Sequence, residues 1–402
     1  MRDIYADHAG TTEPAPEVVE AMRSWLGAHF GNASSVHRRG ERAREAIENA
    51  RAQVASLIGA APEEIVFTAS GSEANNLALK GVIQETDRGG ARAPRRRIVV
   101  SMIEHPSVLE TARHLASARG ITLTEVPVAP NGVVDPRQIA DVLGPDVALV
   151  SVMLVNNETG ARQPVAEIAA LARASGARMH SDAIQAVGKL PVDVHALDVD
   201  LLSLAGHKFH GPLGAAALYV RRRTRLMPLV HGGHQERSRR AGTENLPALV
   251  GLGMAAERAR ARLAGDAPRI SALGDRLLDG LLAGVRGARL NGDREQRVRS
   301  IVNVCFPGVD GEAVLHELDL AGVTVSTGSA CSAASPGPSH VLLAMGLRPE
   351  DAHASVRFSL GEGNDESDVA RILEVTPPIV ERLRALATSG AEATSSGVGR
   401  AR

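Results

Sequence analysis

The sequence predicts an α/β protein with a mostly parallel sheet. Short apolar runs, such as IVVS at 98–101 and LLSLA at 201–205, alternate with longer segments in which apolar residues recur at helical spacing. These runs lack the in–out alternation of half-exposed strands, which is typical of strands that helices cover on both faces. Polar residues follow several of the runs, where open α/β sheets bind their ligands. We therefore expect functional residues at the carboxyl ends of parallel strands.

The individual elements follow from local patterns along the chain. The opening segment contains DHAGTTEPAP, in which Pro14 and Pro16 disfavour regular structure. A helix is expected from Ser35 to about Gly59, since apolar residues recur there at helical spacing and glycine commonly ends a helix. Further helices are expected at 73–83 and from residues 107 and 164, and strands at 64–68, 98–101, 121–126, 147–154, 177–180 and 201–205.

Length and composition indicate two domains and an intracellular location. A chain of 402 residues can bury a large core, and its net charge of −1 gives no global attraction to nucleic acid or acidic membranes. No apolar run approaches the ~18 residues of a membrane span, and two cysteines cannot form a disulfide framework. We therefore expect a cytoplasmic protein with no membrane partner and no direct nucleic-acid partner.

A turn of small residues, at 69–72, joins the strand at 64–68 to a helix. Such a turn presents backbone N–H groups and hydroxyls at a helix N-terminus, which suits a phosphate group. The turn matches neither the GxxxxGK[ST] nor the GxGxxG pattern. A tight connection without a ligand remains the alternative.

Four polar residues follow four expected strands: His105, Asn157, Asp182 and Lys208. A lysine past the end of a buried strand is partly desolvated, which lowers its pKa and makes the neutral amine available to a carbonyl. The alternatives are a surface lysine, a helix N-cap for Asp182 and a satisfied, partly buried histidine. Together, however, an amine, an acid for a ring nitrogen and a phosphate-binding helix start are what pyridoxal 5′-phosphate requires.

Cys331 lies in a stretch of small residues and prolines, TGSACSAASPGP at 327–338. This composition has no helical or strand period and predicts an exposed, mobile loop of the kind that often carries reacting groups. A free cysteine that a loop merely tolerates is the alternative. Cys305 lies in an apolar run and is expected to be a buried packing residue.

Long collinear motifs give the chain a resemblance to the cysteine desulfurases of the class V aminotransferase family, of the nitrogen-fixation and iron–sulfur-cluster type. The resemblance implies the type I fold of pyridoxal phosphate-dependent transferases, with a mostly parallel seven-stranded sheet and a smaller α/β C-terminal domain. It covers nearly everything before about residue 384. The motifs are DHAGTT, FGNASSVH, EIVFTASGSEANNLALKG, EHPSVLET, VNNETG, HSDAIQAVGKLPVD, AGHKFHGP, HGGHQERSRRAGTEN, TGSACSAASPGPSHVLLAMGL and SVRFSLG.

The expected domain boundaries combine this resemblance with composition. Residues 1–15 join the small domain, and residues 16–262 form the large cofactor-binding domain. Residues 263–386 form the small domain, with a mobile cysteine loop at 326–339. Residues 387–402, rich in Ala, Gly and Ser, are expected to be a disordered tail.

The resemblance implies roles for the residues around the cofactor ring. Lys208 is the lysine that bonds the cofactor, and Asp182 is the partner of the pyridine nitrogen. His105 stacks on the ring and assists catalysis, while Asn157 and Gln185 reach the phenolic oxygen.

It also implies roles around the phosphate and the substrate. Gly71, Ser72 and His207 hold the phosphate. Thr243 reaches the phosphate of a neighbouring subunit, which implies a homodimer. Asn157 and Arg357 bind the substrate, and Arg357 pairs with its carboxylate. The alternative for an arginine in a strand is a solvated or structural ion pair.

The implied activity converts L-cysteine to L-alanine, with Lys208 as the base at Cα and Cys331 as the thiol that takes up sulfur as a persulfide. The implied partner is a sulfur acceptor protein, such as a cluster scaffold or a tRNA-thiolation enzyme. The rival readings are a selenocysteine lyase, an aminotransferase or a non-catalytic scaffold.

Some residues depart from the family pattern or stay outside it. Ala205 stands where many relatives carry a phosphate-binding serine or threonine, Gly10 replaces a usual alanine, and Thr159 replaces an apolar residue. His231 and His234 are close together, but no cysteine or carboxylate pattern completes a metal site, so no metal is expected.

Overall fold

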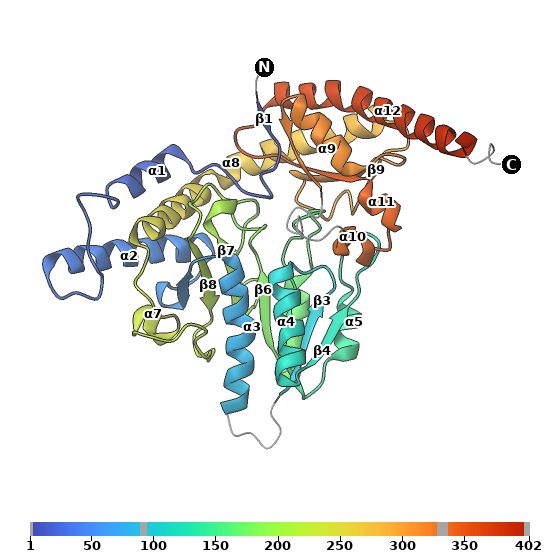
Figure 1. Cartoon of the computed structure of the whole chain (residues 1–402). Helices are drawn as coiled ribbons and strands as arrows, with labels where there is room; N and C mark the ends of the chain where they lie inside the picture. The colour runs from blue at the N-terminus through green and yellow to red at the C-terminus, as the bar shows by residue number, and fades with distance from the viewer. Residues whose placement is uncertain (1–2, 89–94, 328–336, 398–402) are drawn as a thin grey trace.

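The computed structural model describes residues 3–88, 95–327 and 337–397, without the side chains of 87–88 and 389–397. A seven-stranded sheet forms its centre, with strand order β2-β8-β7-β6-β5-β3-β4 (Figure 1). Only β8 runs antiparallel to its neighbours in this sheet, so the predicted fold class is confirmed, and β8 is the strand that the patterns missed. The strands are β2 (Ile65–Thr68), β3 (Arg97–Ser101), β4 (Thr122–Val126), β5 (Val147–Ser151), β6 (Arg178–Asp182), β7 (Leu201–Ala205) and β8 (Ala216–Val220).

Helices cover both faces of this sheet, which explains the continuous apolar runs. On one face, α3 and α4 pack against a core that includes Val66 and Leu201, and on the other, α2, α6 and the first half of α8 pack against Phe67 and Leu202. Successive strand residues therefore enter opposite cores. The helices are α1 (Pro16–Arg23), α2 (Arg38–Leu57), α3 (Gly71–Arg88), α4 (Pro106–Arg119), α5 (Pro136–Val142), α6 (Val165–Ser175), α7 (Gln235–Ser238), α8 (Leu246–Gly284), α9 (Gly311–Leu320), α10 (His340–Ala344), α11 (Pro349–His353) and α12 (Glu366–Gly397).

A second sheet lies beside the far half of α8 (Figure 1). Its strand order is β12-β13-β10-β9, every pair is antiparallel, and α8, α9 and α12 share its apolar core. The strands are β9 (Arg289–Leu290), β10 (Ile301–Cys305), β12 (Ser326–Thr327) and β13 (Ser355–Ser359).

The N-terminal segment connects the two sheets. Strand β1 (Ile4–Tyr5) pairs in parallel with β11 (Val323–Thr324), and Asp7 forms an isolated bridge with Ser359 of β13. The chain then crosses to the large sheet, where the backbone N–H of Thr12 donates to the carbonyl oxygen of His207 at 2.8 Å. Residues 7–10 therefore lie between the sheets.

Three features differ from the sequence expectations or fall outside what the structure describes. Helix α8 runs unbroken across residues 262 and 263, so the expected boundary lies inside a helix. Helix α12 continues to Gly397, whereas a tail without regular structure was expected from residue 387. Most of the expected cysteine loop, at 328–336, lies outside the described residues.

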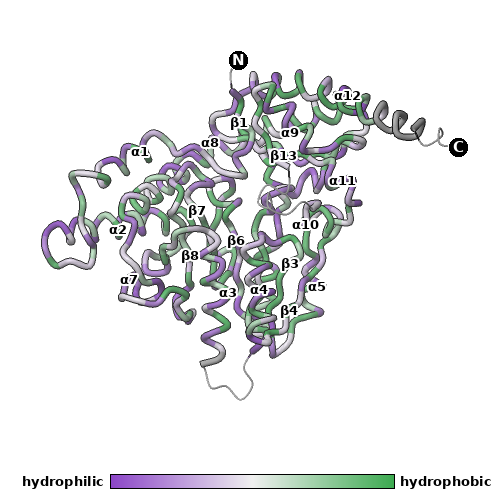
Figure 2. The backbone as a smooth tube through the Cα atoms, viewed as in Figure 1, coloured by the Kyte–Doolittle hydropathy of each residue, from purple (hydrophilic) through white to green (hydrophobic). Residues whose placement is uncertain are grey.

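The hydropathy of the backbone follows this layering (Figure 2). The strands of the large sheet are hydrophobic, while much of α2 and the turn region around α7 is hydrophilic. Within the described residues, no helix is both long and apolar enough to cross a bilayer.

Candidate active site

Strands β3, β5, β6 and β7 of the large sheet end at one cavity of about 930 Å³, a size within the usual range of ligand pockets. Asp182 closes β6, while His105 and Lys208 follow β3 and β7 closely. The predicted site residues that line this cavity are Gly71, Ser72, His105, Asn157, Asp182, Gln185, His207, Lys208 and Arg357.

Lys208 lies directly after β7, at the end of the short 3-10 turn η2 (Gly206–Lys208). Its Nζ donates a hydrogen bond to the carbonyl oxygen of Ala9 at 2.8 Å and another to that of Gly10. The N-terminal segment therefore forms the wall on which this amine rests.

Asp182 is buried, and both of its carboxylate oxygens accept hydrogen bonds. Oδ2 accepts from Nδ2 of Asn75 at 2.7 Å, and Oδ1 accepts from the backbone N–H of Ile184 at 3.0 Å. Asn75 lies in the first turns of α3, so this helix fixes the carboxylate at the end of β6. A carboxylate held in this way keeps lone pairs for a ring N–H donor.

His105 is the N-cap of α4, and its Nδ1 accepts from the backbone N–H of Ser107 at 3.1 Å. Burial lowers the pKa of His105, an effect that Asp182 opposes and Lys208 reinforces. The imidazole is therefore neutral near pH 7, with its proton on Nε2. His105 therefore caps α4 and also lines the cavity.

The start of α3 meets the cavity at Gly71. A Cβ at this position would lie 2.2 Å from Cδ1 of Ile184, so glycine allows the helix start to approach the end of β6 closely. His207 also lines the cavity, and its Nδ1 lies 3.1 Å from Oγ1 of Thr11. Burial, with help from Lys208, lowers the pKa of His207 to about 4, so its ring is neutral.

Arg357 reaches the cavity from β13 of the small sheet. Its Nη1 donates to the carbonyl oxygen of Asn157 at 2.9 Å, and its Nη2 donates to Oδ1 of Asp7 at 2.7 Å. The guanidinium group of Arg357 therefore links the small sheet to the N-terminal segment and to the loop after β5.

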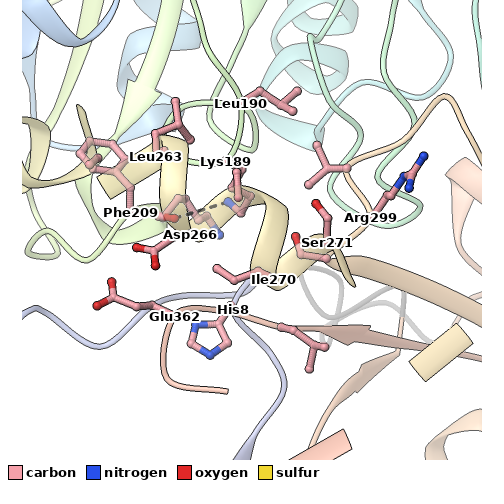
Figure 3. A pocket seen from close by; sticks show the side chains of 18 of the residues that line it. His8, Lys189, Leu190, Phe209, Leu263, Asp266, Ile270, Ser271, Arg299 and Glu362 are labelled. Atoms are coloured by element: carbon pink, nitrogen blue, oxygen red, sulfur yellow. Dashed lines mark hydrogen bonds between the residues drawn. The ribbon is translucent and has the colours of Figure 1, made fainter. Parts of the chain in front are cut away.

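A second cavity of about 260 Å³ adjoins the first, and Lys208 lines both. Lys189 and His8 face it from opposite sides (Figure 3). The Nζ of Lys189 donates to Oε1 of Gln185 at 3.2 Å and to the carbonyl oxygen of Lys208 at 3.4 Å. Burial, together with Lys208 and Arg357, lowers the pKa of Lys189 to about 7. Lys189 thus holds the side chain of Gln185 and the backbone of Lys208 from the second cavity.

Glu104 is fully buried beside the site. Its Oε1 accepts from Oγ of Ser101 at 2.6 Å and from the backbone N–H of Met153 at 2.7 Å, while Oε2 has no hydrogen-bond partner among the described residues. Burial is the largest cause that raises the pKa of Glu104, to about 8, and Asp182 adds to it. The carboxyl group is therefore largely protonated at neutral pH.

This raised pKa predicts a pH-dependent stability. The folded protein keeps a proton on Glu104 that the unfolded chain releases above about pH 4.5, so folding stability falls as pH rises from about 4.5 to about 8. The variant Glu104→Gln mimics the protonated form. The difference in melting temperature between Glu104→Gln and wild type is expected to grow by several degrees in favour of the variant as pH rises from about 4.5 to about 8. Scanning calorimetry measures this difference. The exposed Glu41→Gln is the control, and a difference that does not change with pH contradicts the prediction.

Thr243 and Cys305 lie apart from this arrangement. Thr243 is exposed, in the loop before α8, and is absent from the lining of the described cavity. Cys331 lies outside the described residues. Cys305 is fully buried in β10, which confirms its packing role, and burial raises the pKa of its thiol.

The residues around the first cavity fit pyridoxal 5′-phosphate. They supply an amine, an ordered buried carboxylate, a neutral imidazole face and a helix N-terminus, and the cavity is large enough for the ring and phosphate. Nε of Arg357, a residue that lines the cavity, is buried without a hydrogen-bond partner among the described residues, which suits a polar ligand. Ala205 lines the same space and offers no hydroxyl to the phosphate.

Comparisons with known proteins agree with this site. A family model for class-V aminotransferases matches residues 4–372. The cysteine desulfurase of Gluconacetobacter diazotrophicus is 43% identical over 400 residues, which cover 99% of this chain and 98% of that protein. The cysteine desulfurase IscS of Methanosarcina thermophila is 44% identical over 382 residues, or 95% of this chain and 93% of that protein.

Solved structures give the same result. A NifS-like protein superposes with a TM-score of 0.88 at 34% identity, covering 95% of this chain and 100% of that one. SspA in complex with cysteine superposes with a TM-score of 0.78 at 35% identity, covering 89% and 98%. The fold and the site thus define a pyridoxal phosphate-dependent enzyme, and the chain belongs to the class-V aminotransferase family. Within that family it belongs with the cysteine desulfurases of the IscS and NifS kind.

The sequence patterns missed three residues that hold the site together: Asp7, Asn75 and Lys189. They lie in DHAGTT, in the helix after the small-residue turn and in HSDAIQAVGK, respectively. A signal existed for Asn75, because an amide that follows a ligand-binding turn by one helical turn faces the same direction as the turn.

Proposed function

We propose that this chain is a cysteine desulfurase that converts L-cysteine to L-alanine and takes up the sulfur as a persulfide on Cys331. The convergence of Lys208, Asp182 and the α3 N-terminus on one cavity carries this proposal. The naming of full-length relatives as cysteine desulfurases, and of one similar structure as a complex with cysteine, supports the choice of substrate.

Pyridoxal 5′-phosphate, when bound, supplies an aldehyde that condenses with amines and a ring that accepts electrons from the substrate carbon. Lys208 would hold the aldehyde carbon, and its amine would serve as the base for the proton on Cα of the substrate. Asp182 would accept a hydrogen bond from the ring N–H and keep that nitrogen protonated. His105 would cover the ring face, and Gln185 and Asn157 would hydrogen-bond the phenolic oxygen.

The phosphate and the substrate carboxylate are held at separate places. Gly71, Ser72 and His207 hold the phosphate, and neutral His207 donates or accepts without adding charge. Arg357 pairs with the substrate carboxylate, because its planar fork matches that group.

Sulfur transfer then consumes one thiol and yields one persulfide. The thiolate of Cys331 attacks the substrate sulfur, so that an S–S bond forms as the Cβ–S bond breaks. The electron pair of the broken bond stays with carbon, which takes up protons and leaves as L-alanine.

The assembly and the domain roles are part of the same proposal. Residues 16–262 bind the cofactor. Residues 263–386, together with residues 1–15, form the domain that supplies Arg357 and Cys331. The separate apolar cores around the two sheets support this division. Thr243, exposed in this chain, reaches the phosphate of a second copy in a homodimer. A sulfur acceptor protein takes the persulfide in the cytoplasm.

The direct test incubates the purified holoenzyme with L-cysteine and a thiol reductant. Equal amounts of L-alanine and sulfide are expected. Alanine from L-selenocysteine only would identify a selenocysteine lyase instead. Mercaptopyruvate from L-cysteine, together with a new amino acid from an added keto acid, would identify an aminotransferase. Light scattering at the same time gives the mass of the assembly, and a monomer would contradict the role of Thr243.

A substitution of Asp182 tests the role of this carboxylate as the partner of the ring nitrogen. The variant Asp182→Asn keeps the acceptor toward Asn75 but loses the charge that holds the ring nitrogen protonated. Alanine formation is expected to fall by about 10²-fold or more, the low end of the usual effect of a proton-transfer group. The measurement is kcat for alanine, with cofactor content as the control. A kcat within threefold of wild type at full cofactor content would contradict the role of Asp182.

A further inference from the structure

Two hydrogen bonds hold the guanidinium group of Arg357, one at each Nη atom. Its Nη2 donates to Oδ1 of Asp7 at 2.7 Å, and its Nη1 donates to the carbonyl oxygen of Asn157 at 2.9 Å. The Arg357 side chain is 3% exposed, whereas that of Asp7 is 21% exposed and lines the active-site cavity. The ion pair is therefore buried on the arginine side and open on the aspartate side.

One donor of this guanidinium group is unsatisfied among the described residues. Nε of Arg357 is buried and has no hydrogen-bond partner among the described residues. Nε and the adjacent Nη2 are the two donors that grip a carboxylate in the side-on bidentate arrangement. A buried donor without an acceptor is costly, and an incoming carboxylate removes that cost.

From this geometry we propose that Asp7 is a positioning residue, which turns the Nε edge of Arg357 toward the carboxylate of the amino-acid substrate. The inference rests on the proposed function and extends it to the residue that orients the substrate. Asp7 acts through a single hydrogen bond to Nη2, and the backbone of Asn157 fixes the other end of the guanidinium plane. Without the aspartate, the long arginine side chain keeps only one of its two anchors.

Gly10 leaves the room that this arrangement needs. A Cβ at position 10 would lie 2.3 Å from Oδ2 of Asp7 and 2.9 Å from its Cγ, so a methyl group there would displace the carboxylate. Gly10 does not have a positive φ angle, so alanine fits its backbone conformation. The observed orientation of Asp7 therefore depends on glycine at position 10 in this chain.

Three holoenzyme variants test the inference. Asp7→Ala removes the acceptor, Asp7→Asn keeps an oxygen acceptor without the charge, and Gly10→Ala displaces the carboxylate. Asp3→Ala, an exposed change in the same segment, is the control. KM and kcat of each variant are measured with L-cysteine. Calorimetry gives the Kd of L-alanine, and the cofactor absorbance gives the fraction of subunits that carry the cofactor.

Asp7→Ala is expected to raise KM for L-cysteine and Kd for L-alanine by about tenfold, as the loss of one hydrogen bond to a charged group does, while kcat stays within threefold. Asp7→Asn is expected to restore both constants to within threefold of wild type, and Gly10→Ala to give intermediate values. Unchanged constants in Asp7→Ala, or equal damage in Asp7→Asn, would overturn the proposal. If the wild type makes no alanine from L-cysteine, the proposed activity fails, whereas the L-alanine constants still decide the role of Asp7.

Discussion

The variant Lys208→Ala is expected to form alanine from L-cysteine at least about 10³-fold more slowly than wild type, within the range for loss of a catalytic proton-transfer group. Two functions are lost at once, because the same Nζ holds the cofactor aldehyde and removes the proton from Cα. The hydrogen bonds of this amine to the carbonyl oxygens of Ala9 and Gly10 are lost with it. The assay is alanine formed per cofactor-loaded subunit.

A small primary amine distinguishes this loss from misfolding. Added methylamine fills the space of the missing side chain and can serve as the base, so it is expected to restore part of the activity of Lys208→Ala. The melting temperature of the variant serves as the control for folding. Activity of Lys208→Ala above a tenth of the wild-type rate, without added amine, would contradict the assignment.

Cys331→Ala is expected to lose sulfide release by at least about 10²-fold, because no other side chain with a nucleophilic thiol is available to take the sulfur. The sequence contains two cysteines, and the second, Cys305, is fully buried in β10 with a raised thiol pKa. The cofactor absorbance of Cys331→Ala should match that of wild type, since the change leaves the ring contacts in place. Sulfide released from L-cysteine under reducing conditions is the measurement.

The buried cysteine provides a matched control. Cys305→Ala removes one small buried side chain, which costs some stability but leaves the site intact, so its sulfide release should equal that of wild type. Mass spectrometry after a single turnover should find an added sulfur atom on Cys331 in wild type and in Cys305→Ala. Sulfide release by Cys331→Ala at the wild-type rate, or added sulfur on Cys305, would refute the role of Cys331.

Much of the fold was predictable because its signals are local. The runs at 98–101 and 201–205 are strands of the central sheet, as their continuous apolar character indicated. Strand β8 was not predicted because AALYV begins with two alanines, and alanine is a strong helix former that is depleted in strands. The sequence placed His105, Asp182 and Lys208 after strands, and parallel strands bring such ends to one edge.

Contacts between distant segments could not be predicted in the same way. Asp7 and Arg357 are 350 positions apart, and nothing local to either residue indicates the other. Their contact depends on β1 joining β11, which brings the N-terminal segment between the two sheets. The low pKa of Lys189 has the same origin, because its burial comes from the packing of α8 and the N-terminal segment around the second cavity.

The proposed mechanism requires that Lys208, and no other lysine, bonds the cofactor. The sequence contains three lysines, at positions 80, 189 and 208. Lys189 is a real competitor, because it lies next to Lys208 and burial lowers its pKa to about 7, which favours the nucleophilic neutral amine.

Borohydride reduction of the holoenzyme fixes the cofactor to its lysine, and trypsin does not cut after a modified lysine. We predict that the pyridoxyl mass appears on the peptide of residues 190–221, which contains Lys208 uncut. The same mass on the peptide of residues 179–208, where Lys189 would remain uncut, or on no lysine at all, would contradict the account.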